Sequence, residues 1–185
     1  MNPVIFIDGL TEKMSIQKLC PGMKIVQTLC NGKKVEISAI AKRIATNLKI
    51  LKGRHYPVII LIDREDRTSS IHDIKRLLTK ELKSLSINDE LLIGVCDRMI
   101  ENWMLADKKN IKKYTSTRNL EKVISEGCGG KSTIKKLIPT YRETTTGVTL
   151  LTTSDPNEMY TNSESFKDFV ETIKKIECKW LSTIS

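Results

Sequence analysis

Tyr56-Pro57-Val58-Ile59-Ile60-Leu61-Ile62 is the most continuously apolar stretch of the 185-residue chain, and Asp63 follows it directly. A run of this length that is rich in β-branched residues is typical of a central strand in a parallel sheet, where helices cover both faces. The stretch therefore predicts a buried strand whose parallel neighbours are reached through crossover connections.

Strand-like and helix-like segments alternate on both sides of this run. Short apolar runs predict further strands at 3–7, 23–29 and 91–96. Apolar residues at helical spacing predict helices at 11–19, 35–51 and 71–85. This β-α-β-α-β-α-β order favours an α/β fold with a doubly wound sheet.

The composition changes after Asp107, where basic and polar residues dominate. Between residues 108 and 136, nine Lys/Arg stand against two glutamates, a net charge of +7 within a total of +9. We divide the chain into an α/β core at 1–107 and a basic helical extension at 108–185, packed on the core as part of a single domain. Helices are expected near 120–124, 132–137 and 163–180.

Composition also limits the setting and the cofactors. No apolar run approaches the ~20 residues that a membrane-spanning helix needs, and the opening Met1–Asp8 lacks the basic region of a signal peptide. The five cysteines include no Cys-x-x-Cys pair and only two histidines are present, which argues against a zinc site or a secreted disulfide framework. We expect a cytoplasmic protein without a membrane partner, whose cysteines are mostly buried small hydrophobes.

Acidic side chains follow three of the predicted strands. They are Asp8, Glu12, Asp63, Glu65, Asp66 and Glu101. Open α/β sheets gather ligand-binding residues at the carboxyl ends of their strands, so we expect these side chains to converge on one patch. Carboxylates held close together repel one another unless they are protonated or bridged by cations. A hard divalent cation, Mg²⁺ or Mn²⁺, is the expected partner.

Two alternatives remain open for these acidic residues. Asp8 or Thr11 could cap the first helix, and Asp66 or Thr68 the third, without any chemistry. After the central strand, either Asp63 and Glu65 or Asp63 and Asp66 could act together. Alternation favours the pair Asp63 and Glu65 slightly, because residues two apart on an extended strand face the same way.

Three short motifs together resemble a known family. Asp8-Gly9-Leu10-Thr11-Glu12 resembles the Glu-Gly-x-Ser/Thr-Asp/Glu opening of TOPRIM domains, and Asp63-Arg64-Glu65-Asp66 resembles their Asp-x-Asp segment. Glu101-Asn102-Trp103-Met104-Leu105-Ala106-Asp107 is similar to a segment of small stand-alone TOPRIM-like proteins, which are related to the OLD (overcoming lysogenization defect) nuclease and to RloB-type defence proteins. Residues 141–147 and 165–169 resemble the carboxyl-terminal part of those proteins, so the resemblance covers most of the chain.

The resemblance implies a TOPRIM-like, mainly parallel four-stranded sheet and metal-dependent phosphodiester chemistry. It implies that one or two Mg²⁺ or Mn²⁺ ions are bound by the first acidic residue and the later carboxylates, which here are Asp8, Glu12, Asp63, Glu65 and Asp66. Glu101 joins them in the expected catalytic set. The resemblance also implies a defence role beside a separately encoded ATPase.

The chain departs from the family pattern at three places. In the second motif, Asp63 is followed by Glu65 at the usual spacing and by Asp66 one residue later, so either could act. Asp8 stands where the first motif usually has a glutamate, so it is one methylene shorter. Thr144 or Thr145 stands where related short proteins often carry a lysine, and Lys131 or Arg142 would have to supply that positive charge.

A basic segment directly follows the last acidic motif. Lys108, Lys109, Lys112 and Lys113 are spaced to place two pairs on one side of a short helix. Together with Lys131 and Arg142, they are the expected contacts to DNA or RNA, because neutralising phosphates gives affinity independent of sequence. Aromatic residues make up only 5% of the chain, which argues against base stacking. A solvated lysine-rich face is the alternative.

These features favour a divalent-metal-dependent nuclease that cleaves phosphodiester bonds. The first alternative is a catalytically weak TOPRIM-like subunit that binds nucleic acid or a protein partner, with homo-oligomerisation left open. A second is a receiver-like phosphotransfer regulator, because that fold also collects acidic residues at strand ends. The Glu101 and Asp107 pair around Trp103 and the basic extension disfavour this second alternative.

Overall fold

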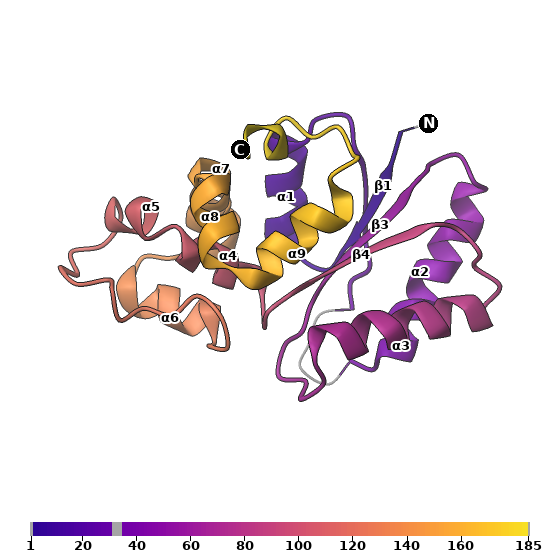
Figure 1. Cartoon of the computed structure of the whole chain (residues 1–185), viewed down its shortest axis with the longest axis horizontal. Coiled ribbons are helices and arrows are strands. Elements are labelled where there is room, and N and C mark those ends of the chain that lie inside the picture. The colour runs from indigo at the N-terminus through magenta and orange to yellow at the C-terminus, as the bar shows by residue number, and fades with distance from the viewer. Residues whose placement is uncertain (1, 31–34, 185) are drawn as a thin grey trace.

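The computed structural model of this chain describes residues 2–30 and 35–184 (Figure 1). Its sheet has the strands β1 Val4–Ile7, β2 Lys24–Gln27, β3 Val58–Asp63 and β4 Leu91–Cys96 in the order β2-β1-β3-β4. All three strand pairs are parallel. The predicted α/β fold with a parallel four-stranded sheet is therefore confirmed.

Helices cover both faces of this sheet. The crossovers are α1 Leu10–Leu19, α2 Ile37–Leu51 and α3 Ile71–Ser84, close to the predicted ranges. Figure 1 shows α2 and α3 on one face and α1 with the later helix α9, Glu164–Ile173, on the other.

Alternation along the strands creates two hydrophobic clusters, one on each face. Val4 and Phe6 point into the cluster with α2 and α3, whereas Ile5 and Ile7 point into the cluster with α1 and α9. All four side chains are almost fully buried. Because both faces are covered, the inner strands β1 and β3 are apolar at nearly every position and appear in the sequence as continuous apolar runs, whereas the edge strand β2 contains Lys24 and Gln27.

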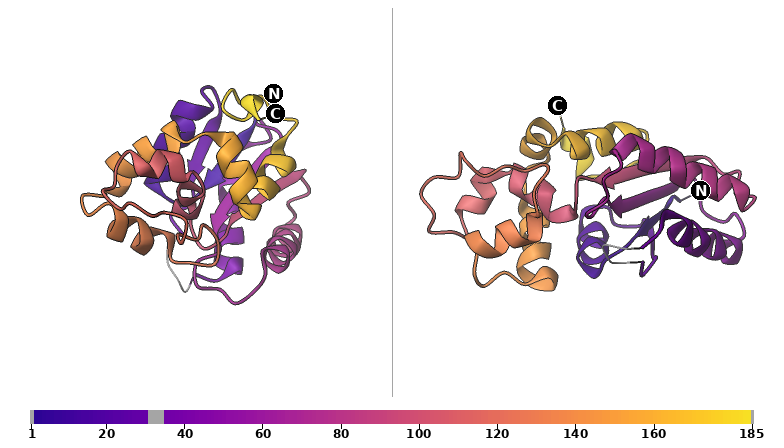
Figure 2. Two further views of the ribbon diagram at one scale, coloured as in Figure 1. Left: turned by 60° about the vertical axis from the view of Figure 1, so that its left-hand side comes forward. Right: turned by 90° about the horizontal axis from the view of Figure 1, so that it is seen from below.

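The chain after β4 is helical and gathers beyond the carboxyl ends of the strands before α9 returns over the sheet (Figure 2). Its elements before α9 are α4 Ile100–Ala106, α5 Lys108–Lys112, α6 Gly130–Leu137, the π-helix η1 Glu143–Gly147, α7 Val148–Thr153 and α8 Pro156–Asn162. A short 3-10 helix, η2 Leu181–Thr183, follows α9. The division of the chain at 107/108 stays a prediction.

Two of the predicted carboxyl-terminal helices differ from the structure. Residues 120–124 form turns instead of a helix; a single turn has little cooperative stability of its own, and here the ammonium of Lys108 binds the Glu121 carbonyl. The helix predicted at 163–180 ends at Ile173, seven residues early. The chain beyond it turns back toward the end of α1, where Cys178 is bonded to Cys20.

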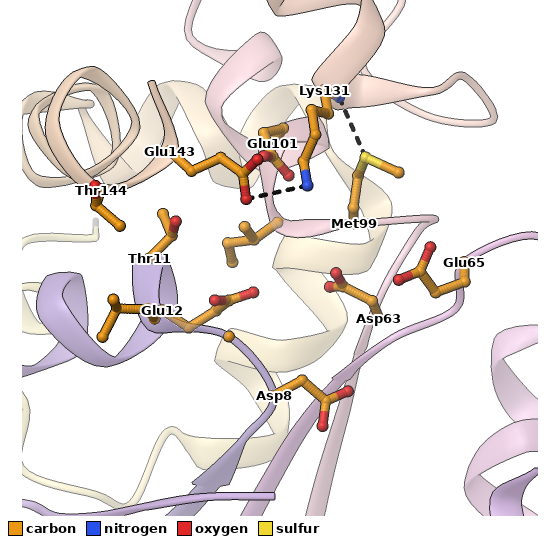
Figure 3. Close-up of a pocket in the computed structure, with 13 residues that line it drawn as sticks. Asp8, Thr11, Glu12, Asp63, Glu65, Met99, Glu101, Lys131, Glu143 and Thr144 are labelled. Atoms are coloured by element: carbon orange, nitrogen blue, oxygen red, sulfur yellow. Dashed lines mark hydrogen bonds and ion pairs between the residues drawn. The ribbon is translucent and has the colours of Figure 1, made fainter. Parts of the chain in front are cut away.

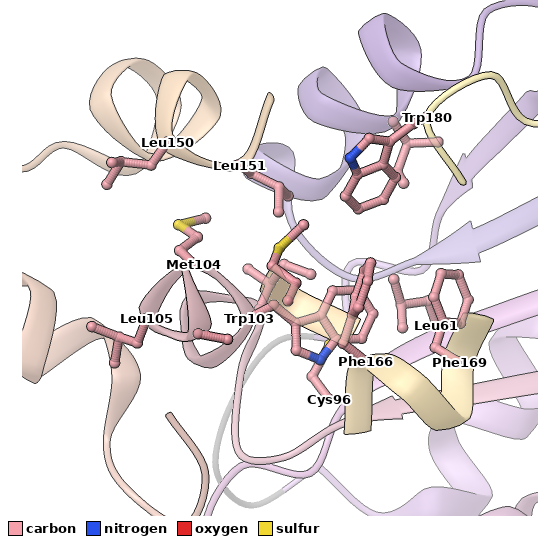
Figure 4. Close-up of a cluster of buried hydrophobic side chains, with 14 of the residues drawn as sticks. Leu61, Cys96, Trp103, Met104, Leu105, Leu150, Leu151, Phe166, Phe169 and Trp180 are labelled. Carbon is pink, nitrogen blue, oxygen red and sulfur yellow. The ribbon is translucent and has the colours of Figure 1, made fainter. Parts of the chain in front are cut away.

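Trp103 is the centre of the packing between α4 and α9 (Figure 4). Its ring lies 5.0 Å from that of Phe166 and 5.3 Å from that of Phe169, and its indole N–H donates to Ser165 Oγ at 2.9 Å. Phe169 packs so closely on β4 that a Cβ at Gly94 would come within 2.3 Å of its ring. This packing fixes α4, and with it Glu101, against the sheet.

The cysteines differ from the expectation. Cys20, at the end of α1, forms a disulfide with Cys178. The expectation that the cysteines are mostly separate buried hydrophobes is therefore wrong for this pair, although Cys96 is free and buried as expected. The two positions are 158 residues apart, and only the fold brings them together. In the described part of the chain, no helix is both long and apolar enough to span a membrane.

Candidate functional site

A cavity of about 510 Å³ lies where the strands end (Figure 3). Its acidic lining residues are Asp8, Glu12, Asp63, Glu65, Glu101 and Glu143. Lys131 is the only lysine or arginine among the described residues that line it. The predicted convergence thus holds for five of the six acidic residues, and the lining adds Glu143.

The turn between β1 and α1 places Asp8 and Glu12 on the same side of the cavity. Asp8 follows the last residue of β1. The hydroxyl of Thr28, just after β2, donates a hydrogen bond to the Asp8 carboxylate. Glu12 lies in the first turn of α1 and folds back over Gly9. A Cβ at position 9 would lie 2.2 Å from Glu12 Oε2. Glycine is needed here because the carboxylate occupies the space that a side chain would take.

Replacing Gly9 with alanine is therefore expected to move the Glu12 carboxylate out of its position while the fold remains. The clash is with the far end of a flexible side chain, which can rotate away, and Gly9 itself has an extended backbone that alanine adopts freely. An NMR titration of the Glu12 carboxyl in the variant should show a pKa closer to the ordinary glutamate value. An unchanged Glu12 titration in a folded variant would contradict the placement of this carboxylate.

The segments that follow β3 and β4 are joined by a hydrogen bond between two residues with unusual backbone conformations. Glu65 and Arg98 both have left-handed φ angles, 57° and 65°, and the Glu65 N–H donates to the Arg98 carbonyl at 2.7 Å. Such conformations cost free energy in non-glycine residues and gather at functional sites. The bend directs Glu65 into the cavity, whereas Asp66 forms an ion pair with Arg98 at 2.9 Å and is not among the lining residues.

Glu101 enters the cavity from the first turn of α4, and the carboxyl-terminal half holds it in place. Its carboxylate is buried and accepts a hydrogen bond from the Tyr141 hydroxyl at 3.0 Å. Gly130 allows α6 to approach, because a Cβ there would lie 2.8 Å from the backbone nitrogen of Asn102. The same approach brings Lys131 to the cavity, where its ammonium lies 3.1 Å from Glu143.

Burial and mutual repulsion raise the pKa of the cavity carboxyls. Desolvation and then the charges of Glu101 and Asp8 raise the pKa of Glu12 to about 7. Desolvation raises the pKa of Asp63 well above its ordinary value, and Glu12 is the charge that adds most to this effect. Figure 3 shows these two carboxylates pointing toward one another. Burial also raises the pKa of Glu101, and the Lys131 charge opposes this shift.

A pH dependence of folding stability follows from Glu12. Between its ordinary pKa of 4.5 and about 7, the folded protein holds a proton that the unfolded chain has released. The free energy of unfolding should therefore fall as pH rises through this window, by up to about 1.4 kcal/mol per pH unit from this group. Urea unfolding of metal-free protein at several pH values measures it. Glu12→Gln should remove this part of the slope, and an equal slope in both proteins would contradict the assignment.

The cavity suits a hard divalent cation by its donor atoms, although it is not a ready-made coordination sphere. No group of three or more His, Cys, Asp or Glu side chains within 2–30 and 35–184 stands in an arrangement that could hold a metal ion. Mg²⁺ usually keeps several waters and is bound through one or two carboxylates and substrate phosphates. Glu12 and Asp63 face each other with raised pKa values, so a cation between them would relieve their repulsion.

Helix capping does not account for the acidic residues at the strand ends. The N-cap residue of α1 is Gly9, and no side chain caps that helix. The cap of α3 is Ser70, whose hydroxyl accepts from the Asp73 N–H. Asp8, Thr11, Asp66 and Thr68 therefore do not occupy the capping positions that the alternative assigns to them.

The basic residues predicted to contact nucleic acid fall into two groups. Lys131 lines the cavity, whereas the four lysines of the segment 108–113 lie outside the lining. All four also make contacts within the extension: Lys108 with the Glu121 carbonyl, Lys109 with Glu158, Lys112 with the carbonyls of Thr117 and Arg118, and Lys113 with the side-chain oxygen of Asn110. Arg142 is exposed beside Glu143.

Comparisons with known proteins address the fold. A scan against protein-family models found no match, and a search of curated proteins found no significant relative. Among solved structures, the chain is similar to the C-terminal region of the Burkholderia pseudomallei OLD protein. The TM-score is 0.51 at 13% identity, with 94% of this chain and 97% of that chain covered. The two share a fold.

The similarity to the OLD region supports the OLD-related, TOPRIM-like fold that the three motifs predict. It extends through the helical extension, since it covers almost the whole chain. At this identity it concerns the fold alone, so the roles of individual side chains rest on the geometry of the cavity.

Sequence reasoning missed two residues at the cavity. Glu143 begins the π-helix η1, and π-helical turns are frequent at functional sites, but no periodicity in the sequence reveals one. In the sequence, Tyr141 stands out only as part of the stretch 141–147. Its hydrogen-bond partner, Glu101, lies 40 residues earlier. A buried tyrosine needs a hydrogen-bond partner, yet the sequence does not say which one.

Proposed function

We propose that the protein is a divalent-metal-dependent nuclease that cleaves nucleic-acid phosphodiester bonds in this cavity. The observation that carries the proposal is the gathering of six carboxyl groups and one lysine at the strand ends. Burial and neighbouring like charges both disfavour ionised carboxylates, so a cluster that contains the buried Asp8, Glu12 and Glu101 is more typical of a functional site than of a purely structural one. The similarity to an OLD region supports a nuclease-related domain.

In this proposal, Asp8, Glu12, Asp63 and Glu65 hold one or two Mg²⁺ or Mn²⁺ ions. A bound ion of this kind polarises a phosphate, lowers the pKa of a water and stabilises the leaving oxygen. Asp66 is the remaining candidate from the sequence and would have to leave Arg98 to take part.

The other residues of the cavity would position the substrate and manage protons. Glu101 lies at the cavity with a raised pKa and is oriented by Tyr141, so it suits proton transfer to or from a water. Lys131 would contact a non-bridging phosphate oxygen or the leaving oxygen, the role left open by Thr144 and Thr145. The four lysines of the segment 108–113 and Arg142 would bind the flanking backbone of DNA or RNA.

We also propose that the protein works in a bacterial or mobile-element defence system beside a separately encoded ATPase. The sequence motifs and the OLD-like fold support this role. It is an argument by analogy of fold and motif, and the cavity itself carries only the chemistry.

The proposal is tested by incubating the purified protein with labelled duplex DNA, single-stranded DNA and RNA, each with Mg²⁺, Mn²⁺ or EDTA. We expect cleavage of at least one substrate with Mn²⁺ or Mg²⁺ and none with EDTA. Absence of cleavage for every substrate and ion, together with tight binding of nucleic acid, would favour the alternative of a catalytically weak binding subunit. The absence of a preformed metal-ligand group among the described residues is the observation that favours this alternative.

A further inference from the structure

We propose that Glu143 competes with the substrate phosphate for the ammonium of Lys131, so that the Lys131–Glu143 ion pair restrains binding at the site. This inference rests on the proposed function, because it takes Lys131 as the group that receives a phosphate. It assigns Glu143 a role in selecting and admitting substrate. Glu143 lies in none of the three sequence motifs.

The geometry places this ion pair across the cavity. Lys131 comes from α6 and Glu143 from η1, and the Lys131 Nζ to Glu143 Oε2 distance is 3.1 Å. Figure 3 shows the lysine side chain reaching from above toward the carboxylates, with Glu143 beside it. The charges of Glu101, Glu143 and Asp63 all act on the Lys131 ammonium. An incoming phosphate therefore meets a lysine that already has an anionic partner.

Glu143 is the carboxylate that can most easily release the Lys131 ammonium to a phosphate. Glu101 is buried and held by Tyr141, whereas the Glu143 side chain is 45% exposed and that of Lys131 is 41% exposed. Exposed ion pairs contribute little free energy, so an anion from solution can replace one partner at low cost. A phosphate has the charge and the acceptor oxygens to take the place of the Glu143 carboxylate on Lys131.

The pair has a second consequence for charge. The Glu143 carboxylate adds to the repulsion that the other carboxyls exert on a phosphate. It also neutralises the positive charge of Lys131, the lysine among the described lining residues. Removing its charge should therefore strengthen phosphate binding in two ways. Lys131 becomes available, and one repulsive charge disappears.

The test compares wild type with Glu143→Gln, which keeps the shape of the side chain and removes its charge. Binding of a labelled single-stranded oligonucleotide, with Ca²⁺ in place of Mg²⁺, is measured over a series of salt concentrations. We expect Glu143→Gln to bind about two- to fivefold more tightly, because an exposed pair of this kind contributes up to about 1 kcal/mol, which corresponds to about fivefold in affinity. We expect the slope of log K against log salt to steepen by about 0.7, corresponding to one more neutralised phosphate.

Glu171→Gln is the matched control. Glu171 forms an exposed ion pair with Lys174 at 3.3 Å on α9, so the variant has the same change in net charge away from the cavity. We expect it to bind as wild type does, apart from a small general charge effect. In a Lys131→Met background, Glu143→Gln should give only the smaller gain that comes from the lost repulsion, and the double-mutant cycle isolates the coupling between the two residues.

Equal affinities of Glu143→Gln and Glu171→Gln would overturn the inference, as would a gain from Glu143→Gln that is equally large in the Lys131→Met background. Cleavage with Mn²⁺, measured on the same proteins, is a separate result. Tighter binding by Glu143→Gln without cleavage by any of the proteins would support the role of Glu143 and contradict the nuclease proposal.

Discussion

Asp63→Asn should abolish metal-dependent cleavage while leaving the metal-free protein at least as stable as wild type. Burial raises the pKa of Asp63 most, and the charges of Glu12, Glu101, Asp8 and Glu65 raise it further. Asparagine keeps the shape and removes the charge, so a metal ligand is lost and the repulsion is relieved. Lewis-acid stabilisation by a metal contributes several kcal/mol, so the rate should fall by about 10³-fold or more.

Asp66→Asn is the matched control for this variant. Asp66 lies three residues further on, pairs with Arg98 and is outside the cavity lining. It should keep most of the cleavage activity, with a modest effect through the neighbouring Glu65. An Asp66→Asn protein as inactive as Asp63→Asn would show that Asp63 and Asp66, and not Asp63 and Glu65, act together. A fully active Asp63→Asn protein would contradict the account of the cavity.

Reduction of the Cys20–Cys178 disulfide should lower the free energy of unfolding more than any single change at the cavity. The bond joins positions 158 residues apart, and the loop-entropy argument gives about 5 kcal/mol for a loop of this size. It also anchors the segment after α9 to the end of α1, the helix that carries Glu12. Urea unfolding with and without a thiol reductant measures the effect.

A control separates this bond from other thiol effects. Replacing Cys20 and Cys178 with alanine should reproduce the destabilisation and make the protein insensitive to reductant. Replacing the free Cys128 with serine should leave the reductant effect in place. Equal unfolding midpoints for the oxidised and reduced wild-type protein would show that the bond contributes nothing to stability.

The strands were predictable because each one is identified by the apolar residues of its own short segment. The run Val58–Ile62 is buried on both faces, and that environment requires the apolar, β-branched residues that identify it. The same reasoning located β1 and β4 and, through them, the carboxyl ends where Asp8, Asp63 and Glu101 lie. Alternation favours Glu65 over Asp66, and Glu65 does line the cavity, but it reaches the cavity through a left-handed backbone and not as a continuation of the strand.

The extension was less predictable because its contacts are long-range. α4, α7 and α8 are each only six or seven residues long and are held by packing around Trp103 and its neighbours. Short helices have weak periodic patterns, since nucleation depends on tertiary contacts. The disulfide and the bond from Tyr141 to Glu101 join distant segments for which one sequence contains no pairing signal.

Paramagnetic broadening by Mn²⁺ tests most directly whether the cavity binds a divalent cation. In NMR spectra of the 21.0 kDa protein, substoichiometric Mn²⁺ should first remove the amide signals of the residues that follow β1 and β3, including Gly9 and Arg64. Excess Mg²⁺ should restore these signals, and Asp63→Asn should leave them sharp. Broadening confined to other parts of the protein, or no selective broadening at all, would contradict a metal site at the ends of the strands.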